Sequence, residues 1–263
     1  MAGRRLRITH RTGYRYAEVV EASFNEVRMT PMSAEGQLLL SHTLDVLPAA
    51  PIQSYTDYWG AHVEAFDVHV PPRMLEIVAI STVDTPPLPP YRAGGSWLQV
   101  HDPVVQDRFV EFLRSTTYVD DAAQDPDRAW IVERMREEKD PESAAHLATY
   151  EVRRRIGYQP GVTDVSTTAA QAWRSGHGVC QDFTHATLSL LRGAGIPARY
   201  VSGYLHTEEP AVGEPVVGES HAWVEYWDEG WHAIDPTNDR AVGSAHVIVA
   251  RGRDYADVPP LKG

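Results

Sequence analysis

The feature that most constrains the fold of this chain is a change in the spacing of its apolar residues near residue 85. Before that point apolar and polar residues alternate, and β-branched and aromatic residues are frequent, as in strands with one buried face. We expect strands at residues 6–16, 19–29, 37–46, 52–59, 63–70 and 75–83. Short turn-like links join them, which predicts an antiparallel β-sandwich or barrel.

A proline-rich stretch separates the two patterns. Residues 85–90 read Thr-Pro-Pro-Leu-Pro-Pro and are followed by Gly94 and Gly95, a composition that continues neither a helix nor a strand. At 263 residues the chain is also long for one compact domain. We therefore predict a β-rich domain over residues 1–90 and a second domain over residues 91–263.

The second part begins with helix signals. Asp-Pro pairs occur at residues 102–103, 125–126 and 140–141. Each pair offers an N-cap acceptor followed by a residue whose fixed φ suits the first helical turn, so we expect three helices. Gly157 is expected to end the third helix in a left-handed C-cap. Thr168 and Gln171 have the spacing of a capping box, which predicts a further short helix.

The remainder combines one amphipathic helix with strands. Residues 180–192 place apolar side chains at the spacing of a buried helical face, and glycines and a proline follow. Strand-like alternation returns at residues 198–205, 221–227 and 231–235. We therefore expect an α+β fold, in which this helix packs on an antiparallel sheet.

Charge and hydropathy argue against some classes of function. The chain has 24 Lys and Arg and 36 Asp and Glu, a formal net charge of −12, which disfavours nucleic acid as a partner. No segment is long and apolar enough to span a bilayer, and no apolar stretch follows Arg4 and Arg5 to complete an export signal. We expect a cytoplasmic protein without a membrane partner, and the sequence does not define an oligomeric state.

Cys180 is the one cysteine of the chain, so it has no partner for an internal disulfide or a thiolate metal site. It lies at the expected start of the helix over residues 180–192, where free N–H groups and the helix dipole favour a thiolate. Gly176 and Gly178 flank it and would let the backbone approach a substrate closely. A buried thiol that only packs in the core is the alternative. The position at a helix start favours a nucleophile.

A cysteine nucleophile needs a histidine and a group that orients the histidine. Residues 228–230, Asp-Glu-Gly, are typical of a three-residue hairpin loop with glycine in the left-handed position. Trp227 then pairs with Trp231. This register puts His221 and Asp235 on one face of the sheet as diagonal neighbours, so the two side chains can meet.

Other histidines compete for a role near the cysteine. In the same register His232 faces the opposite side of the sheet and is expected to be structural. A metal site made of His177, His185, Glu219 and His221 is an alternative, but these residues lack the tight spacing of known metal motifs. We therefore expect no metal and no cofactor.

Four blocks of sequence resemble a known family. They read GVCQDF at 178–183, GIPARYVSGY at 195–204, SHAWVE at 220–225 and WHAIDPT at 231–237. These blocks are similar to the core of bacterial transglutaminase-like proteins, which belong to the papain-like cysteine enzymes. Residues 14–16, 25–28 and 57–60 are similar to the β-rich domain that precedes this core in bacterial members.

The resemblance implies a role for each candidate site residue. Cys180 would be the nucleophile, His221 the general base and acid, and Asp235 the group that orients His221, in agreement with the hairpin register. The second donor to the oxyanion does not carry over, because Gln181 follows the cysteine whereas the glutamine of papain precedes it. The remaining candidates for that donor are Tyr158 and Trp173.

The expected chemistry is the transfer of an acyl group from an amide or peptide through a thioester acyl-enzyme. Resolution by water gives a protease or amidase, and resolution by an amine gives a transglutaminase. We expect hydrolysis, because free cross-linking in the cytoplasm would damage the host and no EF-hand-type calcium loop is present. A non-catalytic peptide-binding module is the third possibility. The expected partner is a peptide or protein substrate, and the loop at residues 207–218 is a candidate gate.

Overall fold

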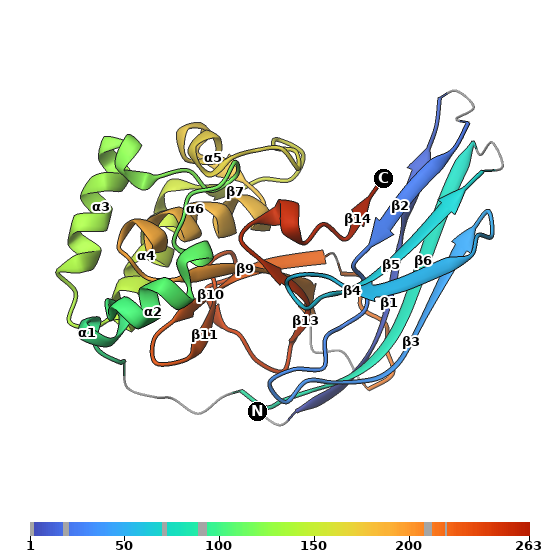
Figure 1. The fold of residues 1–263 in the computed structure, drawn as a ribbon, viewed down its shortest axis with the longest axis horizontal. Helices are drawn as coiled ribbons and strands as arrows, with labels where there is room; N and C mark the ends of the chain where they lie inside the picture. Colours follow the sequence, from blue (N-terminus) through green and yellow to red (C-terminus); the bar gives the residue numbers. More distant parts are fainter. Residues whose placement is uncertain (1–2, 18–20, 70–72, 89–93, 208–211, 219) are drawn as a thin grey trace.

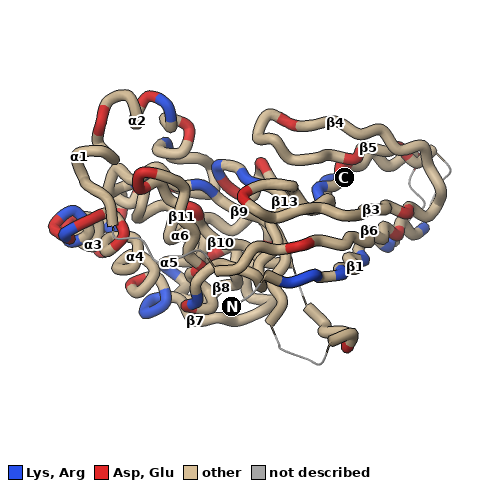
Figure 2. The backbone as a smooth tube through the Cα atoms, turned by 90° about the horizontal axis from the view of Figure 1, so that it is seen from below, with Lys and Arg blue, Asp and Glu red and all other residues tan. Residues whose placement is uncertain are grey.

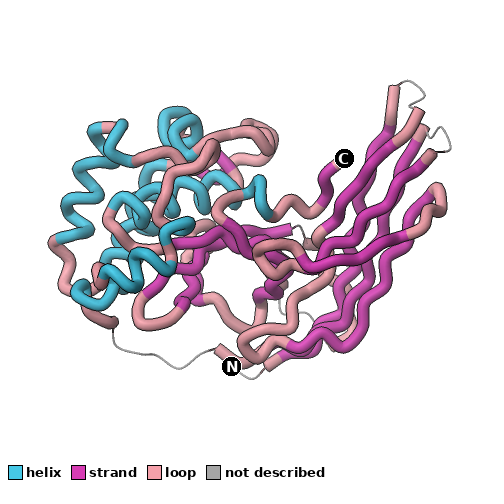
Figure 3. Tube along the Cα trace, viewed as in Figure 1, coloured by secondary structure: helices cyan, strands magenta, loops and turns pink. Residues whose placement is uncertain are grey.

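The computed structural model describes residues 3–17, 21–69, 73–88, 94–207, 212–218 and 220–263. Figure 1 shows two parts side by side. One part consists of strands from the start of the chain, and in the other part helices cover a second sheet. Figure 3 shows that the helices lie in one part, whereas both parts contain strands.

The strands of the first part form where the alternation predicts them. They are β1 (Arg4–Arg15), β2 (Ser23–Val27), β3 (Leu38–Leu47), β4 (Ile52–Thr56), β5 (His62–Val68) and β6 (Met74–Thr85). One antiparallel sheet has the order β1-β6-β3, and the other has the order β14-β2-β5-β4. Val27, Phe66 and Ile77 are among the buried residues that pack between the sheets. Of the two predicted architectures, the structure has the sandwich.

One strand end differs from the prediction. The strand expected to reach Trp59 ends at Thr56, because Oδ1 of Asp57 accepts hydrogen bonds from the N–H groups of Trp59 and Ala61 at 3.0 and 2.9 Å. These bonds close a turn into β5. Three predicted limits lie outside the described residues: the strand ends at Val19 and Val70, and the domain boundary between residues 90 and 91.

β1 lies at the edge of its sheet and carries several arginines, visible as a row of basic positions in Figure 2. Arg5 and Arg11 form ion pairs with Asp84 and Glu76 of β6 at 2.7 and 2.6 Å. Charged side chains along an exposed edge oppose pairing with strands of other molecules. The basic residues of β1 therefore protect the edge of the sandwich.

The helices that the Asp-Pro pairs and the other helix signals predict are present, together with others that the sequence analysis did not predict. They are α1 (Trp97–Val100), α2 (Pro103–Arg108), η1 (Val110–Phe112), η2 (Ala122–Gln124), α3 (Pro126–Arg136), α4 (Pro141–Arg155), α5 (Ala169–Ser175), α6 (Cys180–Gly193) and η3 (Tyr255–Asp257). The carboxylates of Asp102, Asp125 and Asp140 accept backbone N–H groups of α2, α3 and α4. Among the described residues, no helix combines the length and apolar character needed to cross a bilayer.

The predicted C-cap of α4 is wrong. Gly157 is extended and starts β7 (Gly157–Tyr158), which pairs in parallel with β8 (His177–Gly178). The left-handed glycine is Gly176, which has a φ of 71° and caps α5 instead. The capping box of Thr168 and Gln171 at the start of α5 is present as predicted.

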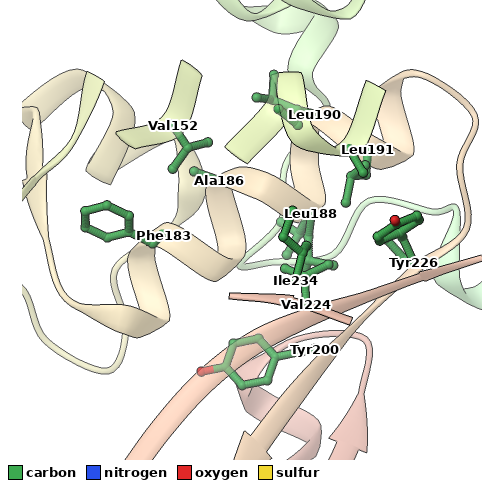
Figure 4. Packing of buried hydrophobic residues seen from close by; sticks show 14 of the residues in the cluster. Val152, Phe183, Ala186, Leu188, Leu190, Leu191, Tyr200, Val224, Tyr226 and Ile234 are labelled. Atoms are coloured by element: carbon green, nitrogen blue, oxygen red, sulfur yellow. The ribbon is translucent and has the colours of Figure 1, made fainter. Parts of the chain in front are cut away.

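The second part is built around α6 and an antiparallel sheet. The strands β9 (Ala198–Leu205), β10 (Ser220–Trp227), β11 (Trp231–Asp235), β12 (Arg240–Ala241) and β13 (His246–Gly252) have the order β12-β11-β10-β9-β13. α6 packs on β10 and β9, while α3, α4 and α5 cover its other sides. Figure 4 shows Leu188 of α6 against Val224 and Ile234 of the sheet. This packing fixes the start of α6 above the strands that carry His221 and Asp235.

The hairpin between β10 and β11 has the predicted register, with Trp227 opposite Trp231 and Val224 opposite Ile234. The prediction for the glycine of the loop is wrong. Glu229 takes the left-handed conformation, with a φ of 59°, and Gly230 does not. The N–H of Asp228 donates to the carbonyl of Gly230 at 2.8 Å, so the loop closes with the expected length.

The end of the chain returns to the first part. After β13 and η3, β14 (Leu261–Lys262) pairs with β2 as the edge strand of the sandwich. β13 is itself held from the sandwich side, since the Gln37 side chain bonds both backbone groups of Ile248 at 2.8 Å. The N–H of Met32 also donates to the carbonyl of Ile248 at 2.9 Å. The two parts are therefore joined by backbone pairing as well as by side chains.

Candidate active site

Cys180 is the first residue of α6 and is partly exposed. The first N–H groups of a helix have no partner within the helix, so the sulfur lies beside free donors. Oδ2 of Asp182 accepts the N–H of Val179 at 2.8 Å and the hydroxyl of Thr163 at 2.7 Å. These bonds tie the turn before Cys180 to the loop that follows β7.

The two glycines before Cys180 serve the local backbone. Gly176 ends α5 in the left-handed conformation, which residues other than glycine adopt at a cost. Gly178 is buried, and a Cβ at this position would lie 2.5 Å from Cβ of Asp182. Gly178 therefore also has a packing role, because Asp182 fills the space beside it.

His221 lies between the other two candidate residues. Nε2 of His221 is 2.9 Å from Oδ2 of Asp235, and the Cys180 side chain is near enough to raise the pKa of the ring. Burial lowers the pKa of His221, but the hydrogen bonds with Asp235 and Cys180 and their negative charges raise it to about 9. Since Nε2 faces Asp235, Nδ1 is the nitrogen left for the sulfur. The structure thus brings together the three residues selected from the sequence.

Asp235 is fully buried and accepts hydrogen bonds on both oxygens. Oδ1 accepts the N–H groups of Thr237 and Asn238 at 3.0 and 3.2 Å. Oδ2 accepts from His221, and also from Nδ2 of Asn238 at 3.0 Å and from Nε2 of His246 at 3.3 Å. Burial acts to raise the pKa of Asp235, but the bonds from His221 and His246 hold it far below its ordinary range. Asp235 is an anion at neutral pH.

Sequence reasoning missed His246 and Asn238. His246 is on β13, which reaches Asp235 only because β13 pairs with β9 on the far side of β10. Asn238 belongs to the turn after β11, whose carbonyl at Thr237 accepts a hydrogen bond from Arg153 of α4. The only available signal for Asn238 was its position three residues after Asp235.

Aromatic side chains pack around the imidazole rings. Trp223 is fully buried, stacks against His221 at 6.0 Å and meets His246 edge-on at 5.2 Å. A Cβ on Gly203, which lies opposite His221 in the ladder, would approach the Trp223 ring to 2.8 Å. Burial, and then the negative charge of Cys180, raise the pKa of Tyr200 well above its ordinary value.

The other candidate histidines lie apart from this cluster. His232 bonds the carbonyl of Asp228 at 2.9 Å, as expected for a structural residue. His177 is exposed on β8. His185 is fully buried in α6, accepts the N–H of Tyr255, and has a pKa lowered to about 3, first by burial. His185 is therefore neutral.

The candidate oxyanion donors also differ in position. Trp173 is buried in the core of the second part, and its indole N–H has no partner there. Tyr158 is half exposed and lies opposite Gly178 in the β7–β8 pair. Gln181 donates to the carbonyl of Val165 at 3.1 Å and so holds the neighbouring loop.

The proposed metal ligands of the sequence do not form a group among the described residues, and Glu219 lies outside them. The group of potential ligands found in the described part of the chain is His221, Asp235 and His246, whose nearest atoms lie within 4.8 Å of one another. Both histidines direct Nε2 at the same carboxylate oxygen. A metal at this point would displace both of these hydrogen bonds, so the arrangement is that of a hydrogen-bond network.

Comparison with known proteins agrees with this geometry. Residues 128–236 match the model of the transglutaminase-like superfamily, and residues 6–84 match the bacterial transglutaminase-like N-terminal region. The uncharacterized protein ML0607 of Mycobacterium leprae is 41% identical over 260 residues, 98% of this chain and 92% of that protein. The chain belongs to the bacterial transglutaminase-like family. The fold is therefore α+β with a transglutaminase-like core, and the family supports cysteine-based acyl chemistry.

One further relative and one solved structure resemble this transglutaminase-like chain over nearly its whole length. The uncharacterized protein Rv2569c of Mycobacterium tuberculosis is 34% identical over 278 residues, which is 98% of this chain and 87% of that protein. A solved structure of a candidate cysteine protease from Cytophaga hutchinsonii has a TM-score of 0.81 and 21% identity, and covers 100% of this chain and 86% of that one. That likeness establishes that both parts of the transglutaminase-like fold recur together.

Proposed function

We propose that this protein hydrolyses amide or peptide bonds as a cysteine protease or amidase, with Cys180 as the nucleophile. The observation that carries the proposal is the position of His221, which bonds the anionic Asp235 and interacts electrostatically with Cys180. The pKa of about 9 keeps His221 protonated at neutral pH. A cationic imidazole beside the sulfur favours the reactive thiolate.

The reaction follows from these contacts in two halves. The thiolate of Cys180 attacks the amide carbonyl, and the N–H of Cys180 at the start of α6 is placed to donate to the oxyanion. His221 then protonates the departing amine, so the C–N bond breaks and a thioester remains on Cys180. In the second half neutral His221 takes a proton from water, the hydroxide attacks the thioester, and the acid leaves as the thiol returns.

Transfer to an amine is the second candidate, and one comparison favours it. A protein-glutamine gamma-glutamyltransferase of Pseudomonas aeruginosa is 43% identical over 65 residues, which is 23% of this chain. The same thioester serves both reactions, so the receiving nucleophile decides between them. We favour water, because it always reaches an open site and unrestricted cross-linking would harm the cell. A peptide-binding module without catalysis is the remaining alternative.

The proposed substrate is a peptide or protein in the cytoplasm. Nucleic acid is not proposed as a partner, because the chain has a formal net charge of −12. A membrane partner is not proposed either. The proposed chemistry calls for no metal or cofactor, since a thiolate, an imidazole and a carboxylate supply the nucleophile, the acid and base, and the orienting group.

A thiol-directed probe tests the proposed nucleophile. We expect iodoacetamide to alkylate Cys180 at neutral pH at least about 10-fold faster than it alkylates a free thiol, because His221 stabilises the thiolate. His221→Ala should remove this acceleration, and His232→Ala, which alters a histidine outside the site, should retain it. Mass spectrometry locates the adduct. A rate equal to that of a free thiol across neutral pH would exclude catalysis by Cys180.

A competition experiment separates hydrolysis from transfer. Peptide substrates from an unbiased library are incubated with the enzyme, with and without an added primary amine, and Cys180→Ala serves as the control. Under the proposal the free acid remains the main product when the amine is present. A product that carries the amine instead would assign the protein to the transglutaminases by activity as well as by fold.

A further inference from the structure

We propose that His246 is a positioning residue for Asp235 and that it acts as a neutral hydrogen-bond donor through Nε2. This inference rests on the proposed function, since it concerns the same three residues. The carboxylate of Asp235 has two imidazole rings aimed at one oxygen, from His221 at 2.9 Å and from His246 at 3.3 Å. Cys180 raises the pKa of His221, and the causes of the His246 shift do not include Cys180.

The surroundings of His246 fix its tautomer. Nδ1 of His246 faces the backbone N–H of Gly243 at 3.3 Å, and an N–H group can only donate. Nδ1 must therefore accept, and the ring proton lies on Nε2, which donates to Asp235. The backbone N–H of His246 in turn donates to the carbonyl of Gly243 at 2.8 Å, so the ring and its turn form one rigid unit.

The charges around His246 keep it neutral. His246 is 3% exposed, and burial lowers its pKa. Asp235 acts to raise the pKa, whereas the positive charges of His221 and Arg240 lower it further. Two imidazolium ions on one buried carboxylate would repel each other. The site therefore places the charge on His221 and favours His246 as a neutral donor.

The consequence for the reaction is a fixed Asp235. The hydrogen bond from His246 and the backbone bonds from Thr237 and Asn238 hold the carboxylate in one orientation. Asp235 then presents Oδ2 to His221, and the ring of His221 presents Nδ1 to the sulfur. Two residues beyond His246, the backbone of Ile248 on β13 hydrogen-bonds Gln37 and Met32 of the sandwich. The N-terminal part thus supports the strand that positions the site.

Nuclear magnetic resonance of ¹⁵N-histidine tests the state of His246 in the unmodified protein. We expect the Nε2–H neutral tautomer of His246 at neutral pH and a pKa below that of a free histidine, while His221 titrates at about pH 9. Protonation of His246 near the ordinary histidine value of about 6.5, or a proton on Nδ1, would overturn the proposal.

Two substitutions test the positioning role. His246→Leu removes the donor, and the alkylation of Cys180 by iodoacetamide at neutral pH should slow about 10- to 100-fold, as for loss of a hydrogen bond to a charged group. His246→Gln keeps an N–H donor and should stay within about 3-fold of the original rate. Equal rates for His246→Leu and the original protein, with Cys180 still hyper-reactive, would refute the role of His246 alone. A loss of equal size in both variants would also refute it. Slow alkylation of the original protein would instead refute the proposed function.

Discussion

At the scale of single residues, burial and hydrogen bonding act on His221 in opposite directions. Burial removes water from the charged ring, whereas Asp235 and Cys180 supply two hydrogen bonds and two negative charges. The second effect is the larger, so the protonated form persists at pH values where a free histidine is neutral. His221 can then act as the acid that protonates a departing amine.

This balance predicts a pH dependence that differs between two kinds of substrate. The folded pKa of His221 is above its ordinary value, so the protonated form is present at pH 7 and is lost as the pH rises through about 9. For a peptidyl p-nitroanilide, kcat/KM should fall above about pH 9, because the amine needs a proton to leave. The matching p-nitrophenyl ester needs no such proton and should keep its rate. Identical falls for the anilide and the ester would contradict His221 as the general acid.

Local sequence patterns identify some of these residues and miss others. Cys180, His221 and Asp235 follow from a helix start and from the offset that a hairpin loop imposes on its strands, both of which are short-range features. His246 meets Asp235 through a strand that pairs on the other side of the sheet. No spacing along the chain encodes that contact. Asn238 depends on a turn in which Asp239 is left-handed, at a φ of 52°.

At the scale of elements, the start of α6 depends on a close contact between Gly178 and Asp182. The carboxylate of Asp182 bridges the N–H of Val179 and the hydroxyl of Thr163 over the face of Gly178. Any side chain at residue 178 would move this carboxylate. The nucleophile is therefore held by a contact that requires glycine, although Gly178 does not have a left-handed backbone.

Gly178→Ala should consequently weaken both the fold and the site. The added Cβ would lie 2.5 Å from Cβ of Asp182, and such overpacking costs about 1–3 kcal/mol in the free energy of unfolding. Alkylation of Cys180 should slow as well, because the turn before α6 shifts. Chemical denaturation and the alkylation rate measure the two effects. Gly230→Ala is the matched control, since a Cβ there meets nothing within 4 Å. Equal stability of the two variants would show that Asp182 yields without cost.

The positions of elements were more predictable than their ends. An Asp-Pro pair indicates where a helix begins, because Asp caps free N–H groups and the fixed φ of Pro suits the first turn. The ends of helices and hairpins depend instead on which of several neighbouring residues takes the turn conformation. The hairpin after Trp227 kept its register although Glu229, and not Gly230, took the left-handed position. The length of the loop determined the pairing, and the residue type did not.

At the scale of the whole molecule, two parts with separate cores are joined through polar contacts. Arg251 of β13 bonds Glu225 of β10 at 2.8 and 2.9 Å and also pairs with Glu35 of the sandwich. Thr85 at the end of β6 donates to the carbonyl of Ser244 at 2.7 Å. The return of the chain as β14 adds backbone pairing. Two residues of strand carry little periodicity, so the sequence offered no sign of this return.

The Gln37 side chain makes several of the hydrogen bonds at this junction, so its removal should destabilise the whole protein. Gln37 is 5% exposed, and its amide bonds the carbonyl of Met32 at 2.6 Å and both backbone groups of Ile248. Gln37→Ala removes the acceptor of the part-buried N–H of Ile248 and both donor bonds of the amide, and we expect a loss of about 2–4 kcal/mol in the free energy of unfolding.

Urea denaturation of Gln37→Ala measures this loss, and Gln53→Ala provides the control, because Gln53 is exposed on β4 and should change the free energy by less than about 0.5 kcal/mol. Trp59 is the tryptophan of the N-terminal part, and its ring contacts Phe112 and Arg253 of the second part at 5.4 and 5.3 Å, so it reports on the junction. The other tryptophans lie in the second part. Two signals are compared: the fluorescence of Trp59, and the fluorescence of the other tryptophans in a variant that lacks Trp59. If the junction couples the two parts, both signals should follow one unfolding transition when residue 37 is Gln. With Ala at residue 37 the two transitions should move apart or shift together to lower urea. Transitions that stay at the original urea concentration would mean that the remaining contacts, Arg251 with Glu35 and Thr85 with Ser244, hold the two parts together without Gln37.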